Sequence, residues 1–110
     1  TCDTQEDVTT ISGFTTLDEY DTVSSRKILA NQATNEDTTN NRAEFDFDDV
    51  TWTALAAGTR QIQAALLYRQ VTTDADSIPI AFIDSGGFPF TANGGNVVFT
   101  VNVEGVLQIT

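Results

Sequence analysis

The sequence predicts an all-β protein: a small antiparallel β-sandwich or barrel-like domain that carries an extended polar N-terminal arm. Apolar and polar residues alternate with the two-residue period of a half-buried strand, most clearly over residues 42–48 and 96–103. Turn-forming residues separate such short stretches about every 8–12 residues, a spacing typical of sandwiches and barrels. No long stretch repeats its apolar residues convincingly at helical spacing.

The length and the apolar content fit one domain with one modest core. The chain has 110 residues, of which 40% are hydrophobic. Residues 1–24 are polar and rich in threonine and aspartate, so we assign them to the arm. Residues 25–110 then form a single β domain.

Four apolar side chains of the arm are spaced by three residues: Ile11, Phe14, Leu17 and Tyr20. This spacing fits one face of a helix, and it fits equally a loop that pins a few apolar side chains onto a sheet. Threonine and aspartate are poor helix formers and Gly13 interrupts the pattern, so we expect the loop.

Residues 60–70 should form the central strand of the domain. One face of this stretch carries four apolar residues at a period of two, and Ala65 and Leu67 make the middle of the other face apolar as well. A strand with two apolar faces is usually an interior strand with a neighbour on each side. Its polar ends indicate that it crosses the domain from rim to rim. The first face consists of Ile62, Ala64, Leu66 and Tyr68.

Two segments precede the first clearly alternating strand. Residues 26–30 (Arg-Lys-Ile-Leu-Ala) are a short strand candidate. Residues 34–41 lack any apolar side chain and are rich in turn formers, so we expect an exposed loop there.

Residues 42–48 predict a half-buried strand with a charged outer face, because Ala43, Phe45 and Phe47 alternate with charged residues. The phase then slips by one residue, since Val50 and Trp52 carry the apolar face after Asp48-Asp49. A slip of this kind indicates a bulge or a bend.

The second half of the domain should contain three further strands separated by turns. Residues 71–77 are a polar loop, and residues 78–84 a strand with Pro79 at its start or on an edge, because proline cannot donate to a ladder. Residues 96–103 give the clearest alternation, and residues 106–109 close the chain after a turn at Glu104-Gly105.

The charge of the chain restricts its partners. The formal net charge is -11. Nucleic-acid affinity depends largely on basic side chains that neutralise phosphates, so we expect no nucleic-acid partner. Anionic membranes are disfavoured for the same reason, and no run approaches the roughly 18 apolar residues of a membrane span.

The missing residue types argue against an enzyme. The chain has no histidine, and Cys2 is its single cysteine. Ser-His-Asp and Cys-His catalysis, zinc sites of histidine and cysteine, and an internal disulfide are therefore excluded. We interpret Cys2 as an inert thiol. We expect no catalytic residue, no cofactor and no metal.

Two groups of aspartates could in principle bind calcium through their oxygens. The first is Asp46, Asp48 and Asp49, and the second is Asp74 and Asp76. Neither matches the spacing of an EF-hand loop, so we interpret both as solvated acidic surface, with Asp49 bonded to its neighbouring backbone at the bend.

Most aromatic side chains alternate with polar residues and should lie in the core. Phe88 and Phe90 are the exception, because they flank Pro89 between two glycine turns, where burial is least assured. We predict that these three residues form an exposed protein contact, with Phe14 and Tyr20 of the arm as further contact candidates. The aromatic residues assigned to the core are Phe45, Phe47, Trp52, Tyr68, Phe82 and Phe99.

The order of several motifs resembles that of small structural proteins of tailed bacteriophages. An Asp-Asp-Val-Thr-Trp run at residues 48–52 is followed by an alanine-rich strand that ends in Tyr68. An Ile-Ala strand at residues 80–86 then ends in aspartate and glycine, and a valine and threonine strand precedes Gly105 and an apolar close. Similar pieces upstream are residues 11–20, 26–27 and 30–32.

This resemblance implies a non-enzymatic virion protein, a decoration or cement subunit that binds the outer surface of the phage head and stabilises it. Its partners would be the major capsid protein, copies of itself, or both. The alternative is a head or tail fibre component that binds host glycans through Phe88, Phe90 or Trp52. A small hydrolase with paired carboxylates is a third and remote alternative, since no acid pair stands out.

Overall fold

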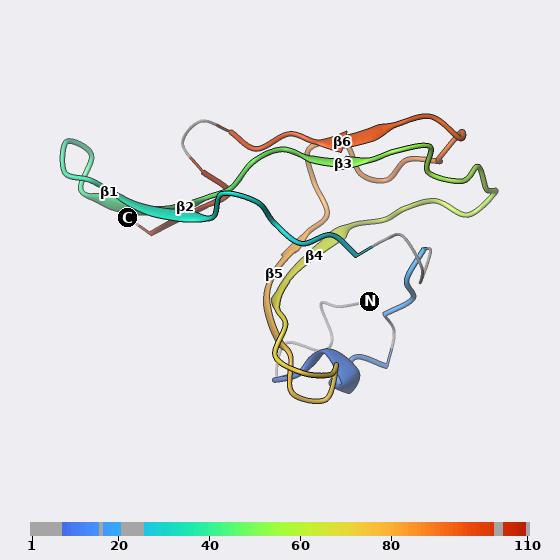
Figure 1. Cartoon of the computed structure of the whole chain (residues 1–110), viewed down its shortest axis with the longest axis horizontal. Helices are drawn as coiled ribbons and strands as arrows, with labels where there is room; N and C mark the ends of the chain where they lie inside the picture. The colour runs from blue at the N-terminus through green and yellow to red at the C-terminus, as the bar shows by residue number, and fades with distance from the viewer. Residues whose placement is uncertain (1–7, 16, 21–25, 103–104, 110) are drawn as a thin grey trace. The chain divides into compact units, whose positions relative to one another are not determined.

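The structure is a computed structural model that describes residues 8–15, 17–20, 26–102 and 105–109. Over these residues the protein is all-β, as predicted, and a 3-10 turn, η2 (Ile11–Gly13), is the one helical piece that they contain. The strands are short and antiparallel (Figure 1). In chain order they are β1 (Ala33–Asp37), β2 (Arg42–Asp46), β3 (Val50–Trp52), β4 (Ala65–Arg69), β5 (Ile78–Ile83), β6 (Val97–Phe99) and β7 (Leu107–Ile109).

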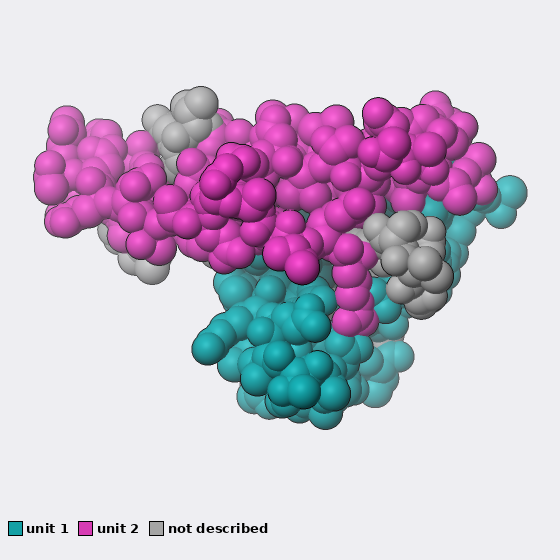
Figure 2. All heavy atoms as spheres, viewed as in Figure 1, with its two compact units in different colours: residues 1–20, 58–92 teal, residues 21–57, 93–110 magenta. Residues whose placement is uncertain are grey.

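The described strands form three small sheets. One sheet has the order β1-β2-β7, a second pairs β3 with β6, and a third pairs β4 with β5. The chain also divides into two compact units, which Figure 2 colours separately. Unit 1 comprises residues 1–20 and 58–92, and unit 2 comprises residues 21–57 and 93–110. The predicted boundary between arm and domain falls within residues 21–25, which lie outside the described residues. Cys2 also lies outside the described residues. The boundary and the inert role of the Cys2 thiol therefore stay predictions.

The β1–β2 hairpin of unit 2 corrects the prediction of a loop over residues 34–41. β1 is a polar strand whose residues are almost all exposed, and only residues 38–41 form the turn. Asp37 stabilises that turn, because its carboxylate accepts hydrogen bonds from the backbone of Thr39 and from both the backbone and the side chain of Asn40. An edge strand that pairs on one side needs no apolar face, so its composition did not reveal it.

The predicted strand over residues 26–30 is absent. Ile28 is 93% exposed, and this segment takes no part in a ladder among the described strands. The end of the segment is instead joined to the bend after β2: Asp48 N donates to Ala30 O, and Asn31 Nδ2 donates to Asp48 Oδ2. The apolar residues of this segment do not form a strand, because none of the described strands is aligned with them.

The predicted bend after residue 48 is confirmed and has a clear structural role. β2 ends at Asp46 and β3 begins at Val50 in a different sheet, so the slip in the pattern marks a change of sheet. Phe47 and Val50 are both buried on either side of it. Asp49 accepts a hydrogen bond from Val101 N at 2.7 Å, so its partner is distant in sequence and not the neighbouring backbone we expected.

The prediction of a central interior strand at residues 60–70 is wrong. Only Ala65–Arg69 is a strand, and β5 is its one neighbour among the described strands. Ile62 makes an isolated bridge to Phe90 instead. The apolar residues of β4 are half-buried, so their two apolar faces reflect partial cover and not an interior position.

The segment around η2 is held against the loop at residues 71–77 within unit 1. Ile11 is buried, and its N–H donates to Ser77 O at 2.9 Å, while Ser12 N donates to Asp74 O at 2.9 Å. Ile11 is thus pinned as expected, but it lies in a 3-10 turn bonded to a loop, where we expected a loop on a sheet. Ser77 is fully buried, and its hydroxyl accepts from Val71 N and donates to Thr73 O.

Candidate interaction surface

The described part of the chain has a small core. Five apolar residues are buried, and Ser77 is the one buried polar residue in this part. Unit 1 contributes Ile11 and Ala92, and unit 2 contributes Phe47, Val50 and Leu55. Small domains with little burial usually gain stability from disulfides, metals or association with other chains. A single cysteine allows no internal disulfide, and no group of three or more metal-ligating side chains occurs in the described ranges.

Four large apolar side chains of unit 1 are exposed on and beside β5. We call them the apolar strip: Val71, Ile78, Ile80 and Phe82 are 51%, 44%, 51% and 40% exposed. Along β5 exposed and half-buried residues alternate, and it is the bulky set at 78, 80 and 82 that is exposed. The prediction that Phe82 lies in the core is therefore wrong.

β5, the strand that carries three of the four strip residues, has no charged residue of its own, although the exposed Arg69 of β4 is paired with Ile78. β5 has the sequence Ile-Pro-Ile-Ala-Phe-Ile, and Asp76 and Asp84 lie beyond its two ends. Its pairing with β4 shifts register between Leu67 and Tyr68, next to Pro79. A bulge and a proline both limit pairing along an edge, so the face of the strand is a better contact surface than its edge.

The predicted contact at Phe88, Pro89 and Phe90 is only partly exposed. The two phenylalanine rings lie 5.7 Å apart in a tilted arrangement, and both side chains are half-buried, while Pro89 is exposed. Phe90 is also fixed by its backbone, since Ile62 N donates to Phe90 O at 2.7 Å and Phe90 N donates to Ile62 O at 3.1 Å. The two rings therefore contact each other, and neither is fully exposed.

Phe14 and Tyr20 are half-buried as well, and Tyr20 has evident partners inside unit 1. The guanidinium of Arg60 lies 5.6 Å from the centre of the Tyr20 ring. Arg60 also forms an ion pair with Asp18, and its Nη2 donates to Glu19 O at 2.7 Å. Gly58 lies so close that a Cβ there would be 2.7 Å from Tyr20 Oη. A contact role for these aromatic residues stays a prediction.

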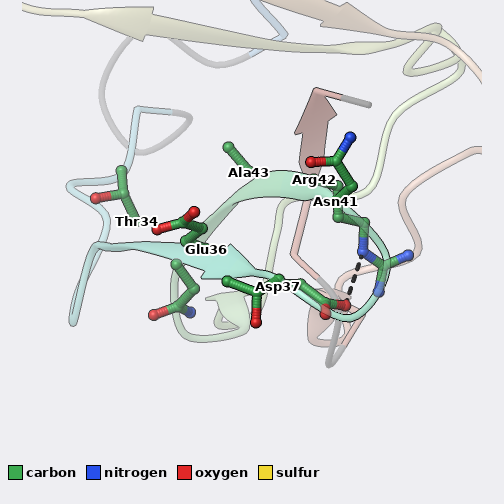
Figure 3. Close-up of a pocket in the computed structure, with 8 residues that line it drawn as sticks. Thr34, Glu36, Asp37, Asn41, Arg42 and Ala43 are labelled. Carbon is green, nitrogen blue, oxygen red and sulfur yellow. Dashed lines mark ion pairs between the residues drawn. The ribbon is translucent and has the colours of Figure 1, made fainter.

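A polar hollow lies along the β1–β2 hairpin (Figure 3). Arg42 is the cation that lines it, and its Nε lies 2.7 Å from Glu44 Oε1 and 3.3 Å from Asp37 Oδ2. Hydrogen bonds from Asn40, and to a lesser extent the charge of Arg42, hold the pKa of Asp37 below its ordinary value. The charges of this hollow serve the hairpin itself, so we assign no ligand to it.

The aspartates considered as calcium ligands have structural partners. Asp76 accepts hydrogen bonds from the backbone N–H groups of Thr73 and Thr72, which lower its pKa. Asp48 and Asp49 accept from Asn31 and Val101. Each of these carboxylates completes a turn or joins two segments.

Sequence reasoning missed the apolar strip because both faces of β5 are apolar and the pattern cannot tell which one is covered. In the described residues we find no helix with the length and apolar character needed to cross a membrane. No protein-family model, curated protein or solved structure matches the chain.

Proposed function

We propose that the protein is a non-enzymatic structural subunit of a phage virion, a decoration or cement subunit that binds the outer surface of the head and stabilises it. The phage assignment comes from the order of sequence motifs. The observation that supports an assembly role is the apolar strip, which combines large exposed side chains with an underlying core of few buried residues.

Covering the strip would supply useful binding energy. Full burial of a large aliphatic or aromatic side chain contributes about 1.5–3 kcal/mol, so covering these half-exposed residues contributes about 1 kcal/mol each and about 4 kcal/mol together. Exposed apolar patches of this kind mark interaction sites. A subunit of a large shell can use such modest contacts because many copies bind side by side.

The acidity of the chain selects the kind of partner. With a net charge of -11, the protein repels other strongly acidic surfaces. The uncharged face of β5 is therefore suited to an apolar patch whose rim is neutral or basic. The glycan-binding alternative gains no support, because sugar stacking needs an open aromatic face and all three of its candidate residues, Phe88, Phe90 and Trp52, are half-buried.

Binding to phage heads that lack the protein tests the proposal. We expect Ile80→Asp to weaken co-sedimentation with heads by about tenfold or more, since it removes about 1 kcal/mol of apolar burial and places a carboxylate in a dry contact. Ile28→Asp is the matched control, because it makes the same change at a more exposed residue outside the strip. Equal binding by both variants would contradict the assignment of the strip, and absence of wild-type protein from heads in images of intact particles would contradict the function.

A further inference from the structure

Asn93 and Gly94 form the one Asn-Gly pair in the sequence, and both residues are exposed. They lie in the turn that precedes β6. The asparagine side chain is folded forward, because Asn93 Oδ1 accepts a hydrogen bond from Gly95 N at 2.9 Å. This bond closes a ring over the peptide between Asn93 and Gly94, which keeps the side-chain amide carbon beside the Gly94 nitrogen.

We propose that Asn93 is a site of spontaneous modification, at which the backbone converts the side-chain amide into a cyclic imide. The Gly94 nitrogen attacks Cγ of Asn93 and forms the new C–N bond. The Cγ–Nδ2 bond breaks, and the side-chain nitrogen leaves as ammonia with the proton that the Gly94 nitrogen gives up. Water then opens the imide at either carbonyl, which yields aspartate or isoaspartate.

Three features of the turn favour this reaction. Gly94 has no Cβ to shield its nitrogen, and apart from its two chain neighbours nothing lies within 4 Å of the position that a Cβ would occupy. The forward fold of the side chain brings the reacting atoms together before reaction, which lowers the barrier. The Gly95 N–H already donates to the oxygen on which negative charge develops during the attack.

The other asparagines lack the first of these features. Each is followed by a residue with a side chain, which hinders attack by the backbone nitrogen. They are Asn31, Asn35, Asn40, Asn41, Asn96 and Asn102. Asn93 should therefore react first, and the remaining asparagines serve as internal controls in the same molecule.

Isoaspartate at position 93 would alter unit 2 because it adds one methylene group to the main chain. The next residues hold the end of the β3 segment: Leu55 N donates to Gly95 O at 3.0 Å, and Ala54 N donates to Asn96 Oδ1 at 3.0 Å. β6 begins directly afterwards, with Val97 paired to Trp52. We expect a longer main chain at this point to disturb these two hydrogen bonds and the register of β6.

The test is to incubate the purified full chain at mildly alkaline pH, both native and unfolded in urea, and to follow each asparagine by peptide mass spectrometry with enzymatic detection of isoaspartate. We expect loss of ammonia at Asn93 before any other asparagine, at a native rate equal to or above the rate in urea. A native rate below the unfolded rate would overturn the proposal, because the fold would then protect the site. Earlier reaction at another asparagine in the native protein would overturn it as well.

The Asn93→Asp variant separates the added methylene from the added charge. Freshly purified, it carries the charge of the product with a normal main chain, and its carboxylate can still accept from Gly95 N. We expect it to keep the wild-type unfolding midpoint of Trp52 fluorescence, whereas the isoaspartate fraction of aged protein unfolds at lower urea. An unchanged midpoint for that fraction would overturn the structural consequence inferred here.

Discussion

Ser77→Ala should destabilise unit 1 more than any other removal of a single serine hydroxyl from its described residues. Ser77 is fully buried, and its Oγ accepts from Val71 N at 3.1 Å and donates to Thr73 O at 2.7 Å. The substitution leaves the Val71 N–H without that acceptor. Loss of a buried partner of this kind costs about 1–3 kcal/mol.

The assay follows the two units separately, because the tryptophan and the tyrosines lie in different units. The single tryptophan, Trp52, lies in unit 2, whereas Tyr20 and Tyr68 lie in unit 1. With a urea m-value of about 1–3 kcal/mol per molar, a loss of about 2 kcal/mol lowers the midpoint of the tyrosine near-ultraviolet signal by about 1 M. Ser85→Ala is the matched control, because Ser85 is exposed in a turn of the same unit. Equal midpoints for the two variants would refute the role assigned to the Ser77 hydroxyl.

Two further predictions concern turns. The pKa of Asp37 is lowered mainly by the side-chain hydrogen bond from Asn40, and the pKa of Asp76 mainly by the hydrogen bond from the Thr73 N–H. The stability that each carboxylate contributes is therefore present above the ordinary pKa of 3.8. It is lost as the pH falls through the lower pKa of the folded state. Urea midpoints measured from neutral pH down to about pH 2 should therefore fall at the acid end. The fall should be less steep in Asp37→Asn and Asp76→Asn than in wild type. Equal slopes would show that these two carboxylates do not cause the loss of stability. Gly105→Ala should cost about 1–3 kcal/mol or more, because Gly105 has a φ of +85° and a Cβ there would be 2.6 Å from Phe45 O. Gly86→Ala, with a φ of +72° and open space around it, measures the backbone strain alone, and an equal loss in both variants would exclude the clash.

The sequence predicted the strands whose apolar residues alternate with charged or polar ones. Residues 42–46, 50–52 and 97–99 are strands, and the slip after Asp48 marks the change of sheet. These features follow from local sequence, because burial on one face imposes a period of two. The strand at residues 78–83, with Pro79 near its start, was also predicted, although both of its faces are apolar.

The failures all concern which partner lies beside a segment. β1 is almost wholly polar and exists because it pairs with β2, whereas the apolar Ile28 lies in a segment that pairs with no described strand. Phe82 was assigned to the core although Ala81 and Ile83 occupy the more covered positions of β5. Where both faces of a strand are apolar, composition does not determine the covered face, and the apolar strip could not be predicted.

The β1–β2 hairpin offers a practical route to display foreign peptides. Its tip at residues 38–41 is exposed, and the carboxylate of Asp37 fastens the turn from within the hairpin. Exposed loop tips are the positions that best tolerate added sequence. An epitope placed between Asn40 and Asn41 would lengthen the tip of the hairpin, keep the bonds from Thr39 and Asn40 to Asp37, and leave the sequence of unit 1 unchanged.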